Sequence, residues 1–183
     1  SHFIMASSKS ISFRIYLLGF LALCAVVAWL ALAHLPDGRL HVYFLDVGQG
    51  DAIFIRAPDG RQVLVDGGPS PAALLDDLGS LLPFWDRSLD LVVLTHPDAD
   101  HMNGLLPLFE RYRIATVLDT VQDGSETPVW SAALAAHAGQ RITARRGMQL
   151  ALNDLRMTVL HPAEPLPPDT SDNAASLVLR LDY

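Results

Sequence analysis

The residues best suited to chemistry lie in one short run, Thr95-His96-Pro97-Asp98-Ala99-Asp100-His101, which brings two imidazoles and two carboxylates within six residues. Crowded together, such groups repel one another or lose hydration, and a cation between them removes both penalties. Imidazole combined with carboxylate suits zinc, manganese or iron better than calcium, which prefers oxygen ligands alone. The run therefore predicts a site for a divalent metal.

The neighbouring segments indicate how this run is held. Leu89–Thr95 is nearly all apolar, which predicts a strand buried on both faces. Gly104 follows the run, and the amphipathic segment Leu105–Tyr112 predicts a helix. A strand that leads into a loop and then a helix presents ligands at the edge of a sheet. A solvated polar loop that caps the helix is the alternative interpretation.

Short runs after residue 40 predict the rest of the fold. Ser70 as N-cap and Pro71 at the first helical position predict a helix over Ala72–Leu82. The turn Pro58-Asp59-Gly60 predicts an antiparallel hairpin between the strands on either side of it. The strands predicted by alternation are His41–Val47, Ala52–Arg56, Gln62–Asp66, Ala115–Asp119, the region of Ile142, Gln149–Leu152, Leu155–Leu160 and Ala175–Asp182, with a helix at Pro128–Ala138 and an irregular loop at Pro162–Thr170. This order predicts an α/β fold with a mixed sheet covered by helices.

The N-terminal segment Ile15–Leu35 contains no Asp, Glu, Lys or Arg and is about long enough to cross a bilayer. Lys9 and Arg14 precede it, so the positive-inside rule puts the N-terminus in the cytoplasm and everything after the segment outside. Ala31-Leu32-Ala33 also fits a cleavage site, and a secreted domain is the alternative. An anchor is favoured because the apolar run is long for a signal core.

Composition sets further limits. The chain has 183 residues, enough for one domain with a sizeable core. Its net charge of −7 argues against a broad electrostatic footprint for nucleic acid. The basic cluster of Arg141, Arg145 and Arg146 is interpreted as a solvated face. Cys24 is the only cysteine, which excludes an intrachain disulfide. The residues before Met5 are interpreted as a non-native leader within the N-terminal region 1–14.

Three motifs in register resemble a known family. Leu45-Asp46-Val47-Gly48-Gln49-Gly50-Asp51-Ala52, Leu64-Val65-Asp66-Gly67-Gly68 and Thr95–His101 have the order and spacing of the metallo-β-lactamase superfamily. More narrowly, they resemble the extracytoplasmic metallo-hydrolase domain of the ComEC family of bacterial DNA-uptake (competence) proteins. Asp172–Leu179 and the junction at Pro36–Leu40 are similar to segments of the same family. The resemblance covers residues 40–183.

The resemblance implies an αββα sandwich with two metal ions, zinc or manganese, at one edge of its sheets. His96 and Asp98 would bind the first ion, and Asp100 and His101 the second. Asp98 stands where the lactamases carry histidine, which favours the ComEC-like group and a ligand set more hospitable to manganese. Family members continue into a Gly-Asp strand and a Ser-His-His-Gly-type loop that these residues do not contain. The sequence is therefore expected to hold the first two thirds of the domain, and activity is assigned to the parent protein.

Other residues are expected around the metals. Asp100 is also the candidate to orient or deprotonate a metal-bound water. Asp66 is expected to hold a ligand histidine in position, or else only to accept hydrogen bonds from backbone amides in its turn. His161 is interpreted as a strand-end imidazole facing solvent, with metal ligation as the alternative. Four residues are expected to contact substrate, with turn or loop chemistry as the alternative: Gln49, Asp51, Asn173 and Ser176.

The leading hypothesis is thus a metal-dependent hydrolase, a phosphodiesterase or nuclease, on the outer face of a bacterial membrane. Its expected partners are DNA or another phosphodiester and, through residues 15–35, the lipid bilayer. Two alternatives remain open at this point. One is a membrane-tethered binding or scaffold module without turnover, and the other is a hydrolase of a small ester, lactam or lactone.

Overall fold

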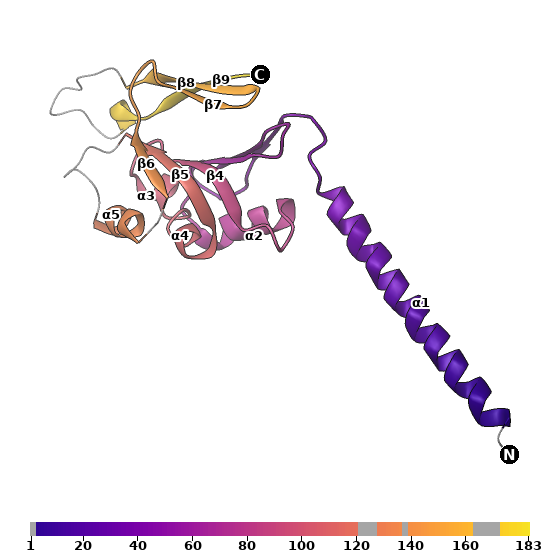
Figure 1. The fold of residues 1–183 in the computed structure, drawn as a ribbon. Helices are drawn as coiled ribbons and strands as arrows, with labels where there is room; N and C mark the ends of the chain where they lie inside the picture. Colours follow the sequence, from indigo (N-terminus) through magenta and orange to yellow (C-terminus); the bar gives the residue numbers. More distant parts are fainter. Residues whose placement is uncertain (1–2, 121–127, 137–138, 163–172) are drawn as a thin grey trace. The chain divides into compact units, whose positions relative to one another are not determined.

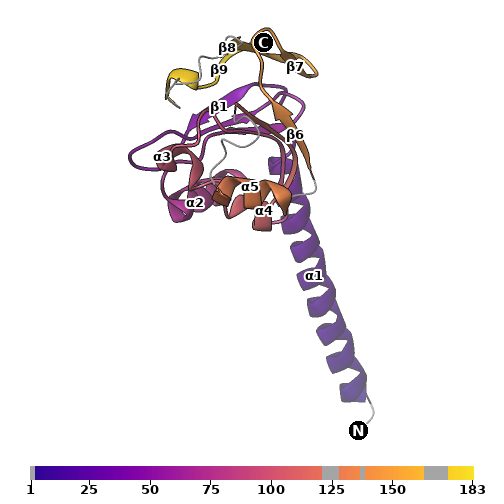
Figure 2. The same ribbon diagram turned by 90° about the vertical axis from the view of Figure 1, so that its left-hand side faces the viewer.

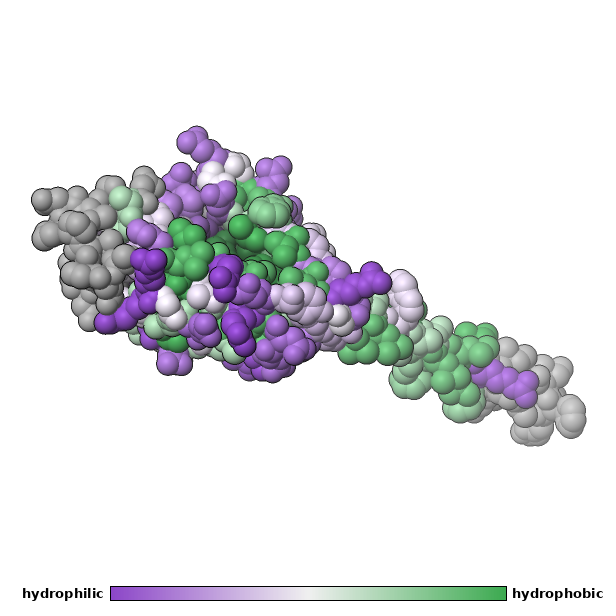
Figure 3. Space-filling view, turned by 90° about the horizontal axis from the view of Figure 1, so that it is seen from above, coloured by the Kyte–Doolittle hydropathy of each residue, from purple (hydrophilic) through white to green (hydrophobic). Residues whose placement is uncertain are grey.

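The computed structural model describes residues 3–120, 128–136, 139–162 and 173–183, and the chain divides into two compact units, Ser1–Leu35 and Pro36–Tyr183. The first unit is helix α1 (Phe3–Ala33). Its segment Phe13–Ala33 is long and apolar enough to cross a membrane and is not buried against protein. Figure 3 shows the apolar surface of this helix. A signal sequence would have the same length and composition.

The second unit contains two sheets (Figures 1 and 2). In the larger sheet the first three strands are antiparallel neighbours and the last four are parallel neighbours: β1 (His41–Phe44), β2 (Ile53–Arg56), β3 (Gln62–Val65), β4 (Ser88–Val93), β5 (Arg113–Asp119) and β6 (Gln140–Thr143). The smaller sheet is antiparallel and consists of β7 (Gln149–Leu152), β8 (Leu155–His161) and β9 (Val178–Asp182).

Helices cover one face of the larger sheet, and the smaller sheet covers the other. The helices are α2 (Pro71–Leu81), α3 (Ala99–Met102), α4 (Leu108–Arg111) and α5 (Pro128–Ala135), with a 3₁₀ turn at Asn173–Ala175. In both views α2, α4 and α5 lie on the side of the larger sheet away from β7–β9. In the described part of the chain, no helix covers the outer face of the smaller sheet. The helix–sheet–sheet layering confirms the predicted fold class.

Two apolar cores result from the alternation of side chains along the central strands. Phe54, Leu64 and Val92 pack on the helical side, whereas Val63 and Leu91 pack towards the smaller sheet. Both faces of these strands are therefore buried, and each such side chain contributes about 1.5–3 kcal/mol by leaving water. This burial explains why β4 is nearly continuous in apolar residues.

The local start of α2 is as predicted. Ser70 is the N-cap, and its hydroxyl oxygen accepts a hydrogen bond from the backbone N–H of Ala73 at 3.3 Å, with Pro71 at the first helical position. The predicted hairpin between β2 and β3 is also present. β1, by contrast, ends at Phe44 rather than at Val47, because the chain turns there into the glycine motif.

Two predictions are wrong in detail. The helix expected at Leu105–Tyr112 is shorter, because α4 begins only after Pro107 and ends at Arg111, and a separate short helix, α3, precedes the predicted segment. Arg141 is not part of a solvated face, since its guanidinium pairs with the fully buried carboxylate of Asp119 at 3.2 Å. The predicted loop at 163–170 and the end of the predicted helix at 137–138 lie outside the described residues.

Candidate metal centre

The candidate metal-binding run, Thr95–His101, lies where β3, β4 and β5 end. Because these strands are parallel, their carboxyl ends meet at one edge of the sheet, and Asp66 directly follows β3 while Thr95 and His96 follow β4. A cavity of ≈ 330 Å³ opens at this edge. It is lined by Asp51, Ile53, Val65, Asp66, Thr95, His96, His101, Ser176 and Leu177.

Asp66 is the centre of the hydrogen-bond network. Its side chain is only 2% exposed, and its carboxylate accepts bonds from the Thr95 backbone N–H (2.8 Å), the Thr95 hydroxyl (2.6 Å) and His101 Nδ1 (2.9 Å). Burial raises the pKa of Asp66, and the hydrogen bonds from Thr95 and His101 act in the opposite direction. Three donors directed at one carboxyl group are suited to its ionised form.

This network also determines which imidazole nitrogens carry protons. His101 donates from Nδ1 to Asp66, which leaves the lone pair on Nε2. The Thr95 hydroxyl proton points to Asp66, so the hydroxyl oxygen accepts from His96 Nδ1 at 3.0 Å. His96, which is only 6% exposed, therefore also keeps a lone pair on Nε2. Both histidines have the tautomer that a metal ligand requires.

Asp98 adds an acidic group to the two imidazoles. Its Oδ2 lies 3.5 Å from His96 Nε2, and the rings of His96 and His101 have their centroids 4.0 Å apart. Asp98 occupies the N-cap position of α3 but makes no side-chain capping hydrogen bond there. Helix capping thus does not account for its carboxylate. A carboxylate oxygen facing an unprotonated nitrogen is unfavourable unless a cation lies near both.

These donors fit a divalent ion in type and protonation, but they do not form a closed ligand set. Within the described residues, no three His, Cys, Asp or Glu side chains converge on one point that could hold an ion. Asp98 and Asp100 are both half-buried, and neither lines the cavity. The two imidazoles are accompanied by the carboxylate of Asp98, next to His96, and by that of Asp51 in the cavity lining, but the described residues do not close into a single ligand set of about four, as a structural zinc site does.

Close backbone contacts hold the metal-binding loop against its neighbours. A Cβ at Gly104 would lie 1.8 Å from the carbonyl oxygen of Gly67, and a Cβ at Gly50 would lie 2.1 Å from the carbonyl oxygen of Asp100. The Gly67 N–H donates to the His101 carbonyl at 2.8 Å. These contacts keep His101 within reach of Asp66, so a side chain at residue 50 or 104 is excluded on steric grounds.

The other predicted site residues differ in position. Asp51 and Ser176 line the cavity. Gln49 is exposed in its turn and does not line it. The side chain of Asn173 lies outside the described part of the molecule. His161 does not line the cavity either, and its Nε2 contacts the carbonyl oxygen of Ala174 at 2.9 Å.

Sequence reasoning missed the apolar wall of the cavity, formed by Ile53, Val65 and Leu177. The backbone N–H of Leu177 donates to the Thr95 carbonyl at 2.9 Å, which brings the end of the chain to the site. Alternation in β2 and β3 was a usable signal, because Ile53 and Val65 are direct partners in the antiparallel register. Thr95 follows β4 and donates to the Asp66 carboxylate from both its backbone N–H and its hydroxyl.

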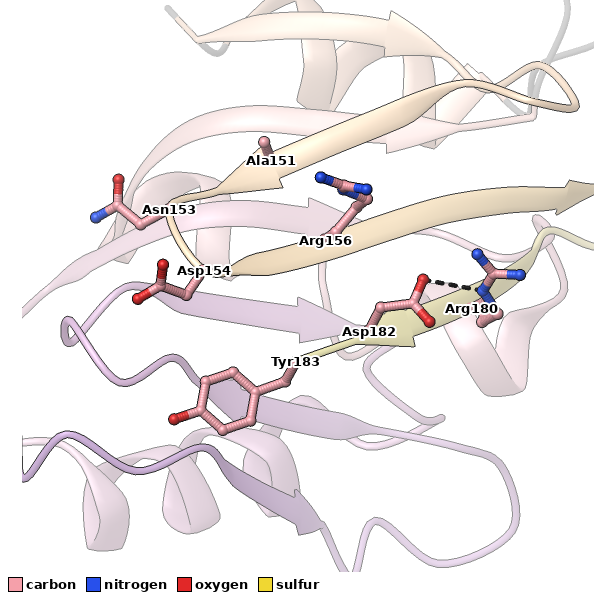
Figure 4. A pocket seen from close by; sticks show the side chains of 7 residues that line it. All are labelled: Ala151, Asn153, Asp154, Arg156, Arg180, Asp182 and Tyr183. Atoms are coloured by element: carbon pink, nitrogen blue, oxygen red, sulfur yellow. Dashed lines mark hydrogen bonds and ion pairs between the residues drawn. The ribbon is translucent and has the colours of Figure 1, made fainter.

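A larger cavity, of ≈ 530 Å³, lies on the smaller sheet and is lined by Ala151, Asn153, Asp154, Arg156, Arg180, Asp182 and Tyr183 (Figure 4). In this cavity Arg180 forms an ion pair with Asp182 at 2.9 Å, and both side chains are about half exposed. We place the candidate site at the smaller cavity, because the buried His96 and the half-buried His101, which pairs with the buried Asp66, line it.

Comparison with known proteins defines the class. The family model of the metallo-beta-lactamase superfamily matches residues 45–179, and the chain belongs to this superfamily. The chain is 29% identical over 181 residues to ComE operon protein 3 of Bacillus subtilis (strain 168), covering 87% of this chain and 23% of that protein. It thus spans about a quarter of the length of this relative. The resemblance stated from the three motifs is confirmed.

Solved structures support the fold alone. A flavodiiron protein from Giardia intestinalis aligns with a TM-score of 0.53 and 14% identity, over 76% of this chain and 36% of that chain. A Cronobacter sakazakii metallo-beta-lactamase HARLDQ motif mutant, S60, aligns with a TM-score of 0.52 and 14% identity, over 76% of this chain and 54% of that chain. The chain therefore has a hydrolase-type fold from a superfamily that generally binds divalent metals.

Proposed function

We propose that this domain is part of a metal-dependent phosphodiesterase or nuclease that acts on DNA outside the membrane, in the context of DNA uptake. The observation that carries the proposal is the shared orientation of His96 and His101, whose Nδ1 atoms are engaged by Thr95 and Asp66 and whose Nε2 lone pairs remain for a cation. The similarity to ComE operon protein 3 supports the DNA-uptake context.

In this proposal His96 and Asp98 hold a first divalent ion, zinc or manganese, and Asp100 and His101 hold a second one. A bound ion would lower the pKa of a water and stabilise charge on phosphoryl oxygens. Asp66 orients His101, keeps its Nδ1 protonated and makes Nε2 a better donor. Asp100 is the candidate to accept a proton from the attacking water. Asp51 and Ser176, on the cavity wall, would contact the substrate.

We further propose that Phe13–Ala33 anchors the protein in a membrane with the second unit outside, or is removed as a signal sequence. Lys9 and Arg14 before the segment support this orientation. The outward position would let the domain meet extracellular DNA. With a net charge of −7, the protein offers DNA little overall attraction, so the bound metal would supply most of it.

A second candidate function has one specific observation in its favour. The described lining of the cavity contains no Lys or Arg and includes Ile53, Val65 and Leu177, which suits a small neutral ester, lactam or lactone better than a polyanion. The assay that separates the two candidates presents single-stranded DNA, double-stranded DNA, bis-p-nitrophenyl phosphate and a chromogenic lactam to the same preparation, with manganese and with zinc. Cleavage of the lactam alone would rule out the nuclease.

Metal binding itself is tested on the full chain by titration with Zn²⁺ and Mn²⁺ and by metal analysis after dialysis. We expect stoichiometric metal in the wild type and its loss in the His96→Ala/His101→Ala double variant. His41→Ala is the matched control, because His41 is a half-buried histidine paired with Asp37 at the start of β1. If the wild type bound no metal, a binding or scaffold module would be the better-supported function.

A further inference from the structure

The edge of the larger sheet opposite the candidate metal centre carries an exposed aromatic pair. Phe84 and Trp85 lie in the segment between α2 and β4, with 80% and 49% of their surfaces exposed, and their rings meet edge to face at 4.8 Å. This segment is held in place, because the Asp86 carboxylate accepts hydrogen bonds from the Ser88 backbone and hydroxyl. Two large exposed aromatics in an ordered segment indicate a contact surface.

The chain enters the second unit at this same edge. β1 begins at His41, which pairs with Arg56 at the end of β2, and Arg56 pairs with Gln62 at the start of β3. Pro36 packs against the turn between β2 and β3, where it lies next to Gly60. β3, β4 and β5 all start at this edge, so the segment before β4 belongs to it.

The distance from this edge to the apolar segment is short along the chain. The candidate span ends at Ala33, and three residues reach at most about 10 Å to Pro36. The headgroup layer of a bilayer is itself about 5–8 Å thick on each side of the hydrocarbon. With the proposed anchor in a bilayer, the chain length alone would hold Pro36 within about 10 Å of the end of the apolar segment.

Exposed arginines lie beside the aromatic segment, and the Arg87 side chain donates from Nε to the Phe84 carbonyl at 3.4 Å. Arg87 lies over the ring of Tyr112 at 5.5 Å, its backbone carbonyl accepts a bond from the Arg113 N–H at 2.8 Å, and both arginines are exposed. Arg111 at the end of α4 is exposed as well, and the exposed Glu110 offsets one of these charges. Guanidinium groups bind phosphate well, and tryptophan prefers the membrane–water interface.

We propose that Phe84 and Trp85, with Arg87, Arg111 and Arg113, form a membrane-contact edge that inserts into the phospholipid headgroup layer. The proposal rests on the proposed membrane anchoring and goes beyond it. It fixes the orientation of the domain, because the candidate metal centre lies at the opposite ends of the same strands and would face the aqueous space. A polymeric substrate could then reach the metal centre without crossing the headgroups.

The test uses the full chain in nanodiscs made with lipids that carry bromine near the headgroup end of the acyl chains, which quench nearby indoles. Trp29→Phe and Trp85→Phe remove the two other exposed indoles, while Trp130 stays fully buried as an internal reference. An indole is then introduced by Phe84→Trp or, as the matched control, by Phe44→Trp. Phe44 is also 80% exposed, but it lies opposite Ile53 at the metal-centre edge.

We expect bromolipid quenching at position 84 to exceed that at position 44 by about two-fold or more. Equal quenching at the two positions, or stronger quenching at position 44, would overturn the membrane-contact edge. Flotation of the chain with liposomes separately reports the anchoring. A chain that floats yet shows no preference for position 84 would leave the anchor intact and reject this inference, whereas a chain that fails to float would reject both.

Discussion

The tight contact between Gly104 and the Asp66-Gly67-Gly68 segment leads to a prediction whose size can be worked out. A methyl group at residue 104 would lie 1.8 Å from the Gly67 carbonyl oxygen, so the two backbones would have to separate by about 1.5 Å. That movement breaks the hydrogen bond from Gly104 N–H to the Gly68 carbonyl (2.9 Å) and the one from Gly67 N–H to the His101 carbonyl (2.8 Å). Each bond contributes about 1 kcal/mol, and overpacking against rigid backbone adds about 1–3 kcal/mol. Gly104→Ala should therefore lower the free energy of unfolding by about 3–5 kcal/mol.

Gly79→Ala is the matched control, because Gly79 is exposed in the last turn of α2 and a Cβ there meets nothing within 4 Å. This substitution should raise the free energy of unfolding by about 0.5–1 kcal/mol through helix propensity. The assay is urea unfolding of the full chain in mild detergent, followed by the fluorescence of the buried Trp130, with Trp29→Phe and Trp85→Phe in every protein.

If Gly104→Ala lowered the free energy of unfolding by less than about 1 kcal/mol, the Gly67-Gly68 segment and the segment at Gly104 would not be in rigid contact. The candidate metal centre would then also lack the rigid contact that positions His101 against Asp66. Zinc titration of the variant provides the second readout. If the loop is displaced as expected, zinc affinity should fall by about ten-fold or more, and an unchanged affinity would contradict the coupling.

Three further predictions concern buried carboxylates. Asp66→Asn, which tolerates the positive φ of 56° at this residue, should lower zinc affinity by about 10–100-fold in a calorimetric titration, since it removes the anionic partner of His101; unchanged affinity would exclude the orienting role. In the metal-free protein, burial raises the pKa of Asp66. The wild type should therefore gain stability relative to Asp66→Asn as the pH falls through that raised pKa towards about 4. Urea midpoints of the two proteins that run parallel across this pH range would refute this prediction. Asp119→Ala removes the acceptor of the Trp130 indole N–H (2.9 Å) and the partner of Arg141, and it should cost about 3–5 kcal/mol by urea unfolding, whereas a loss under about 1 kcal/mol would show that the pair is not effectively buried.

The sequence was sufficient for the architecture wherever a local pattern decided it. Alternation and apolar runs located the strands, and the Ser70-Pro71 pair located the start of α2. Pattern was not sufficient at α3 and α4, because α3 begins after Asp98 inside the polar run and α4 begins only after Pro107. Nor could it reveal the role of Arg141, since its partner Asp119 lies on a neighbouring parallel strand and only the register brings them together.

The candidate metal centre was likewise predictable from the sequence only in part. Parallel strands gather their carboxyl ends at one edge, so the sequence could place Asp66 near the histidines once β3 and β4 were expected to be neighbours. It could not assign protons, because this depends on a single hydroxyl. Thr95 has one hydrogen to donate; Asp66 receives it, and His96 must then donate to the same oxygen. The hydroxyl thus transmits the charge of Asp66 to a second ring, so that one buried carboxylate sets the tautomer of both candidate ligands. Thr95→Val, which keeps the shape but removes the hydroxyl, should therefore release His96 from this tautomer while leaving the direct bond between His101 and Asp66 in place. Nitrogen-15 shifts of the two imidazoles would report the difference, and an unchanged His96 spectrum would contradict the relay.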